Sequence, residues 1–260
     1  MKPMPFGTPW RWALAGTLLG LLLSTLFFAP ARWLATLVQR ASAGQVLLQQ
    51  PRGTVWTGSA RVMLTGGAGS QDAATLPGRV DWQLAPGLTG VGLKLNADCC
   101  LQQAWAMHLQ PRWNGLRLTI ADARSQWPAN LLAGLGTPWN TVQPQGELNL
   151  STQGLTLAWA AGRLQMGGAA QVDVMNLASH LSTLRPMGNY RFSLTGGTPV
   201  TLALTTLQGS LQVSGSGQWV GGQLRFNGEA SAVPEHQAAL SNLLNIIGRR
   251  QGARSIIKVG

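Results

Sequence analysis

The stretch Gly146–Trp159, GELNLSTQGLTLAW, alternates apolar and polar residues in two short runs that each begin at a glycine. Successive side chains of an extended chain point to opposite faces, so Leu148 and Leu150 fall on one face and Glu147 and Asn149 on the other. A period of two over four to eight residues is typical of a strand with one buried and one solvated face. The stretch therefore predicts β-structure with turns at its glycines.

The same alternation recurs on both sides of this stretch, and Gly, Asn and Pro separate the runs as they do in hairpin turns. Leu, Val, Trp and Met alternate with Gln, Arg, Asn, Ser and Thr. This pattern predicts a mainly β protein built as a long antiparallel meander with one buried face. The runs are Arg61–Leu64, Gly78–Leu84, Gly92–Asn96, Trp105–Gln110, Gly115–Ile120, Gly146–Leu150, Gly154–Trp159, Arg163–Met166, Gln171–Val174, Tyr190–Leu194, Val200–Leu204, Gly209–Val213, Gly217–Val220 and Gly222–Phe226.

Two segments depart from the strand pattern. Trp127–Leu135 lacks alternation and predicts a short helix or a connection that lies over the sheet. Pro234–Gly248 has leucines at helical spacing, begins with Pro-Glu and stops at a glycine, which predicts a short C-terminal helix. Two arrangements of this helix are open, because it either packs on the sheet or presents Leu240 and Leu243 outward to a partner.

The N-terminal stretch Ala13–Ala29 is uncharged and rich in leucine, and its length is at the short end of what crosses a bilayer. Trp10 and Trp12 precede it and Trp33 follows it, and indole rings prefer membrane interfaces. The helical pattern continues without a polar break through Val38. We therefore expect a retained single-pass transmembrane anchor, which together with its helical extension occupies residues 13–38.

A cleaved signal peptide is the alternative. Lys2 and Arg11 make a positive N-terminal region, and Ala29-Pro30-Ala31 has the small-x-small form of a cleavage site. With the anchor retained, we expect a cytoplasmic tail over 1–12, a linker over 39–52 and a periplasmic β-rich domain over 53–260. The expected location is the cell inner membrane, with most of the chain in the periplasm.

Charge is scarce in this sequence. Only 10% of its residues are charged, and the net charge of +11 arises because Asp and Glu are few. Nucleic-acid binding usually requires a basic stripe with interleaved aromatics, but these arginines are scattered singly, so we exclude that class. Attraction to acidic phospholipid head groups explains the sign of the charge.

The residues that carry chemistry are isolated from one another. His108, His180 and His236 have no carboxylate or cysteine at ligand spacing, which predicts no metal site. The acidic residues never form a close pair, and the sequence lacks a nucleophile elbow and a phosphate-binding loop. We therefore expect no enzyme, no catalytic residues and no cofactor.

The adjacent Cys99 and Cys100 are the one redox-reactive feature. Neighbouring strand residues point to opposite faces, so we expect one buried and one exposed thiol. A vicinal disulfide is the alternative, and it requires a strained turn that Asp98 beside them would permit.

The stretch Gly53–Ala60, GTVWTGSA, places a tryptophan between two Gly-Thr steps. Gly53 and Gly58 allow a turn or a close approach, and Trp56 offers a large apolar face. We expect Trp56 to plug the membrane-proximal mouth of the β domain, and a contact with a partner or a lipid is the alternative.

Taken in order, five features resemble type II secretion system protein N: the N-terminal anchor, Gly53–Ala60, Val80–Leu84, Gly146–Leu150 and the tail Leu240–Gly248. The similarity covers nearly the whole chain. It implies a non-enzymatic inner-membrane component of the machine that exports folded proteins across the outer membrane, with other subunits of that machine as partners. The adjacent cysteines have no counterpart that we assign in the family.

In texture, the sequence is also similar to the larger AsmA-like proteins, whose curved sheets present an apolar groove to lipids. Two functions therefore stand open: an assembly component of the type II secretion system, and a lipid- or hydrophobe-binding module that takes phospholipid. A through-groove needs unfilled apolar positions from one end of the sheet to the other, whereas a scaffold closes its core with large side chains.

Overall fold

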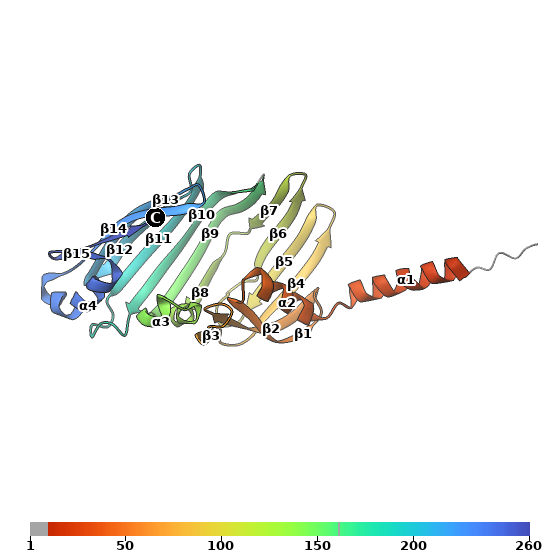
Figure 1. Cartoon of the computed structure of the whole chain (residues 1–260), viewed down its shortest axis with the longest axis horizontal. Helices are drawn as coiled ribbons and strands as arrows, with labels where there is room; N and C mark the ends of the chain where they lie inside the picture. The colour runs from red at the N-terminus through yellow and green to blue at the C-terminus, as the bar shows by residue number, and fades with distance from the viewer. Residues whose placement is uncertain (1–9, 161) are drawn as a thin grey trace, which may run out of the picture.

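The chain folds into one large open antiparallel sheet, seen in the computed structural model of Figure 1. Over the residues that the structure describes, 10–160 and 162–260, the sheet has 16 strands. Its order is β1-β2-β4-β5-β6-β7-β9-β10-β11-β12-β13-β14-β16-β15, with β3 paired to β2 and β8 paired to β9. The order follows the sequence almost throughout, so the predicted meander is confirmed.

The strands range from three to 16 residues. They are β1 (Val46–Gly53), β2 (Thr57–Thr65), β3 (Ala73–Thr75), β4 (Val80–Gly87), β5 (Gly90–Ala97), β6 (Trp105–Arg112), β7 (Gly115–Ile120), β8 (Arg124–Pro128), β9 (Gln145–Ala160), β10 (Arg163–Ala178), β11 (Gly188–Gly197), β12 (Thr201–Gly209), β13 (Leu211–Val220), β14 (Gln223–Ala232), β15 (Arg249–Gln251) and β16 (Arg254–Val259). The helices are α1 (Trp10–Phe27), α2 (Ala31–Ala41), η1 (Ala129–Leu135), α3 (Trp139–Val142), η2 (Pro234–His236) and α4 (Gln237–Ile247).

The register keeps apolar residues opposite apolar residues from strand to strand. In β9 and β10, Leu150 is paired with Val172, and Val172 is paired with Phe192 of β11. On the other face, Asn149 is paired with Asp173. A one-residue slip would exchange the two faces, so the alternation specifies this register.

Helices cover the apolar face at the two ends of the sheet. Near the N-terminus, α2 packs Ala31 and Leu34 onto a cluster that contains Trp82 of β4. Near the C-terminus, α4 packs onto strands β10 to β14. Figure 1 shows these helices at opposite ends, with the long central strands between them. The predicted helices over Trp127–Leu135 and Pro234–Gly248 are confirmed as η1, which begins at Ala129, and as η2 with α4.

The N-terminal region differs from the sequence-based expectation in two places. The helix expected to continue through Val38 breaks at Pro30, because proline has no N–H to donate and disfavours the helical conformation of Ala29 before it. The second helix, α2, then folds back onto β1. Strand β1 begins at Val46, inside the range 39–52 that we expected to be a linker, so the sheet starts earlier than residue 53.

None of the helices within residues 10–160 and 162–260 combines the length and the hydropathy that crossing a membrane requires. The expected transmembrane anchor over 13–38 stays a prediction. Most of the expected cytoplasmic tail, residues 1–9, lies outside the described residues.

Candidate functional site at the joint between the N-terminal helix and the sheet

The turn between β1 and β2 holds the tryptophan that the sequence singled out. The backbone N–H of Thr54 donates to the carbonyl of Thr57 over 2.8 Å. In return, the N–H of Thr57 donates to the Thr54 hydroxyl over 3.1 Å. Gly53 opens the turn with a φ of +84°, and a Cβ there would lie 2.5 Å from the Thr57 carbonyl oxygen. Only glycine fits this position without moving the backbone.

This turn binds the end of α1. The Trp56 indole N–H donates to the Leu26 carbonyl over 2.8 Å, and the Val55 N–H donates to the Ala29 carbonyl over 2.8 Å. The last carbonyls of a helix have no partner within the helix, so both bonds satisfy acceptors that the break at Pro30 leaves open. We call Leu26, Ala29, Val55, Trp56 and the neighbouring Trp82 the anchor joint.

Trp82 of β4 contacts the turn from the neighbouring strand of the sheet. Its indole N–H donates to the Val55 carbonyl over 3.0 Å, and the side chain is only 3% exposed. A Cβ on Gly58 would lie 2.5 Å from the ring atom Cζ2 of Trp82, so the second glycine of the motif makes room for this ring. The two tryptophans therefore tie helix and sheet together through one turn.

The structure places Trp56 at the end of α1, and the partner or lipid contact considered for it stays a prediction. The side chain is half-buried and lies at the end of α1. Its hydrogen-bond partner is the helix, whereas we expected it to cover the open end of the sheet. Trp82 was not expected at this joint, because in the sequence it is one residue of the alternating run Gly78–Leu84.

The C-terminal helix turns its leucines inward. Leu240, Leu243 and Leu244 are buried in the cluster that also holds Tyr190 and Phe226. Of the two arrangements left open, the structure has the inward one, because these leucines continue the apolar face of the sheet. The outward arrangement, in which Leu240 and Leu243 would contact a partner, is not the one in this structure, where the two side chains are 0% and 3% exposed.

Cys99 and Cys100 form a vicinal disulfide, so the prediction of two separate thiols is wrong. The chain turns at this point, and the N–H groups of Cys100 and Leu101 both donate to the Ala97 carbonyl, over 2.9 and 2.8 Å. A turn, unlike a strand, brings neighbouring side chains to the same side. Cys99 is exposed and Cys100 is buried, as the prediction had it.

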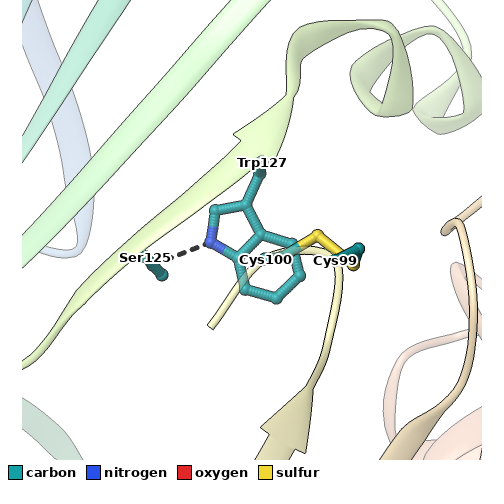
Figure 2. The surroundings of a disulfide bond; sticks show 4 residues. All are labelled: Cys99, Cys100, Ser125 and Trp127. Atoms are coloured by element: carbon teal, nitrogen blue, oxygen red, sulfur yellow. Dashed lines mark hydrogen bonds between the residues drawn. A yellow bond between two sulfur atoms is a disulfide. The ribbon is translucent and has the colours of Figure 1, made fainter. Parts of the chain in front are cut away.

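The disulfide lies beside the indole ring of Trp127, as Figure 2 shows. Trp127 packs against the cluster that contains Cys100, and its N–H donates to the Ser125 hydroxyl over 2.8 Å. The N–H of Gln126 donates to the Cys100 carbonyl over 2.8 Å, which ties the turn to β8. The pair therefore belongs to a packed connection.

The residues with catalytic potential are not brought together into a shared site. His180 contacts Gln145, and His236 lies 2.8 Å from the Ser210 hydroxyl. In the part of the chain that the structure describes, no three His, Cys, Asp or Glu residues are grouped as metal ligands would be.

One carboxylate has a perturbed titration. Arg191 donates to both oxygens of Asp173, over 2.7 and 2.8 Å, and these hydrogen bonds hold the pKa of Asp173 below its usual value of 3.8. On the apolar face, burial raises the pKa of Tyr190, whose hydroxyl donates to the Leu211 carbonyl over 2.9 Å. Both groups stabilise the sheet.

A hollow of about 850 Å³ lies where the sheet divides, since the first half of β9 pairs with β8 and the second half with β7. Its lining is mostly amide, hydroxyl and small side chains: Gln102, Gln103, Ala104, Ala106, Ala121–Gln126, Asn149–Gln153, Gln171 and Asp173. Aromatic side chains, which are common in small-molecule pockets, are absent from this lining, and Leu150 is its one large apolar side chain. The anchor joint, which links two elements of the chain, is therefore the stronger candidate site.

An open antiparallel sheet that is joined to an apolar N-terminal helix defines a mainly β class of protein. The chain belongs to the type II secretion system protein N family: the family model described as "Type II secretion system (T2SS), protein N" matches residues 44–257. That match covers the Gly53–Ala60 turn and the sheet except for the last two residues of β16, and it confirms the resemblance found in the sequence. No curated protein matches the chain, and no solved structure does.

Proposed function

We propose that this protein is a non-enzymatic component of the type II secretion system that contributes to the export of folded proteins across the outer membrane. In this proposal α1 holds the chain at the inner membrane, and the sheet lies in the periplasm, where it contacts other subunits of the system. Membership of the protein N family supports the role in secretion.

The exposure of α1 supports the membrane attachment. Its leucines are exposed around the whole helix: Leu14, Leu18, Leu19, Leu21, Leu22, Leu23 and Leu26. A helix that is apolar on all sides is stable only when it is buried in protein or lipid. The exposed Trp10 and Trp12 at its start are suited to the head-group region.

The anchor joint is the observation that carries this proposal. Through Trp56 and Val55, it fixes the end of α1 to the first turn of the sheet. A force or displacement at the membrane would be passed directly to β1 and β2. Such a connection suits a subunit whose sheet is held at a defined position beside its partners.

The closed ends of the sheet favour this assembly role over a lipid-conducting module. Buried apolar residues fill both ends of the sheet: α2 and Trp82 fill one end, and α4 with Phe226 fills the other. A through-groove would require both ends to be open.

Carbonate extraction and affinity purification test the proposal. The full chain is expressed in cells that carry the secretion system, and Leu18→Arg/Leu22→Arg is compared with Asn242→Arg/Ile246→Arg. The second pair is the matched control, because both of its positions are exposed on α4 with the same spacing of four. Since a charge in a membrane helix is costly, we expect only the first double variant to become extractable.

Purification in mild detergent, with mass spectrometry of proteins and lipids in the same sample, tests the partners. Recovery of secretion-system subunits near stoichiometric amounts with the wild type and the control supports the proposal. Extraction of the wild type by carbonate, or recovery of enriched phospholipid without any secretion subunit, would refute it.

A further inference from the structure

Five hairpins of the meander have their turns on one long edge of the sheet, which we call the tip edge. Every second connection of an antiparallel meander falls on the same edge. The closing pairs of these hairpins are Gly87 and Gly90, Arg112 and Gly115, Ala160 and Arg163, Thr195 and Thr201, and Val220 and Gln223. Figure 1 shows the turns projecting beyond the body of the sheet.

The first three of these hairpins are neighbours and carry large apolar side chains into solvent. Leu88 and Trp113 are fully exposed at the first two tips. Trp159 and Leu164 are paired next to the third tip and are 49% and 52% exposed. Exposed apolar residues that occur singly need no explanation, but a contiguous group marks an interaction site.

These hairpins are in contact with one another. The register pairs β5 with β6 and β7 with β9, with Leu116 opposite Trp159. A shallow hollow of about 570 Å³ between the first two tips is lined by Pro86–Val91 and Gln110–Arg112. The exposed apolar group therefore spans adjacent strands.

The charge of the tip edge has one sign. The hairpin segments 86–91, 110–116, 158–164, 194–201 and 219–224 contain no Asp or Glu, while Arg112 and Arg163 flank the exposed tryptophans. Such a surface complements an anionic one. Adjacent Trp and Arg side chains suit the head-group region of a bilayer. Indole rings prefer the boundary between the hydrocarbon and the head groups, and guanidinium groups bind the lipid phosphates.

The shape of the edge also suits a bilayer. Leu88 and Trp113 project from the ends of two-stranded hairpins, and a fluid lipid surface accommodates such points without a prepared pocket. A protein partner would have to offer a pocket to each of them.

The β1–β2 turn, to which the end of α1 is bound, lies on the same side of the sheet as the tips but short of the tip edge. Thr57 of β2 is paired with Gln83 of β4, and β4 then runs on to its tip at Gly87. The β1–β2 turn therefore lies on the side of the tips, and its Trp56 bonds to Leu26 at the end of α1. Along β4, the turn lies four residues short of the tip at Gly87, and Figure 1 shows α1 leading away from this end of the sheet.

We propose that the tip edge docks on the surface of an anionic phospholipid bilayer. Leu88 and Trp113 insert into the head-group region, and Arg112 and Arg163 bind lipid phosphates. The inference that the tips contact lipid does not depend on the proposed membrane attachment of α1. Only the inference that they contact the same bilayer that holds α1 rests on that proposal.

Photo-crosslinking to lipid tests the docking. The full chain is reconstituted into vesicles of phosphatidylcholine, with or without phosphatidylglycerol, that contain a photoactivatable phospholipid, and the labelled peptides are mapped. We expect label on α1 and on segments 86–91 and 110–116, and more label on these two segments when phosphatidylglycerol is present.

The variant Leu88→Asp/Trp113→Asp is expected to reduce the tip label about tenfold or more while α1 keeps its label. Asn242→Asp/Ile246→Asp is the matched control, because it adds the same charge on exposed positions of α4, and its tip label is expected to equal that of the wild type.

Labelled α1 with unlabelled tips overturns this inference and leaves the proposed anchor intact. Tip label that the Leu88→Asp/Trp113→Asp variant does not reduce overturns it as well. Tip label that is equal in the two lipid compositions overturns the assignment to anionic lipid. Labelled tips with unlabelled α1 support the docking but contradict the anchor, so the two proposals fail separately.

Discussion

Replacing Trp82 by alanine removes the base of the anchor joint. The ring is 3% exposed and packs with Ala31 and Ala60, so its loss leaves a cavity between α2 and the sheet. A buried Trp→Ala change costs about 3–5 kcal/mol. The Val55 carbonyl also loses its hydrogen-bond donor, and the cost of this loss brings the total toward the upper part of the range.

Urea unfolding of the full chain in mild detergent, followed by circular dichroism, measures the effect. With a loss of about 4 kcal/mol and a slope of about 2–3 kcal/mol per molar urea, the midpoint falls by about 1.5 M. The control is Trp113→Ala, the same change at a fully exposed position, which we expect to shift the free energy of unfolding by less than about 0.5 kcal/mol.

A Trp82→Phe variant separates packing from hydrogen bonding. It keeps most of the ring volume and removes the N–H that binds Val55, so we expect a loss of about 1–2 kcal/mol. Equal midpoints for Trp82→Ala and Trp113→Ala would refute the reasoning, because Trp82 would then make no stabilising contact between α2 and the sheet.

Three further predictions concern the sheet and its turn. The depressed pKa of Asp173 contributes stability above its usual value of 3.8 that is lost as the pH falls through the folded-state pKa, so the urea midpoint of wild type should fall more on acidification than that of Asp173→Asn. Tyr190→Phe leaves a buried carbonyl without a donor and should lower the free energy of unfolding by about 1–3 kcal/mol, measured in urea. Iodoacetamide should label the cysteines only after reduction, Cys99 faster than Cys100 because Cys100 is buried; labelling without reductant, detected by mass spectrometry, would contradict the disulfide.

Much of the sheet was predictable because alternation is a local property. In an extended strand, residues two positions apart lie on the same face, whatever the neighbouring strands are. This holds for Leu148 and Leu150 in β9 and for Val172 and Val174 in β10. The short C-terminal helix was predictable for the same reason, since its leucines repeat at helical spacing.

The anchor joint was less accessible to sequence reasoning. Gly53–Ala60 signalled a turn with a tryptophan, but the partner of Trp56 is Leu26, 30 residues earlier in the chain. Likewise, Gly58 is explained by Trp82, whose ring reaches it only because β2 pairs with β4. Contacts of this kind depend on pairing that no local pattern encodes.

The sequence was compatible with either a strand or a turn at Cys99 and Cys100. The tertiary structure has the turn. The hydrogen bonds of Cys100 and Leu101 to Ala97, and of Gln126 to Cys100, fix that turn against β8. For Leu240 and Leu243, helical spacing predicted an apolar stripe, but whether the stripe faced the sheet or a partner depended on what lay beneath it.

By itself, the sequence determined that the chain forms a β meander with one apolar face, because the alternation of side chains decides which groups leave water. Only the tertiary structure decided that the sheet stays open in linear order, that α2 and α4 close its ends, and that the end of α1 is bound to the first turn. The physical reason is that burial and hydrogen bonding between distant segments depend on where the backbone brings them in space, and a periodic pattern specifies only the face on which each residue lies.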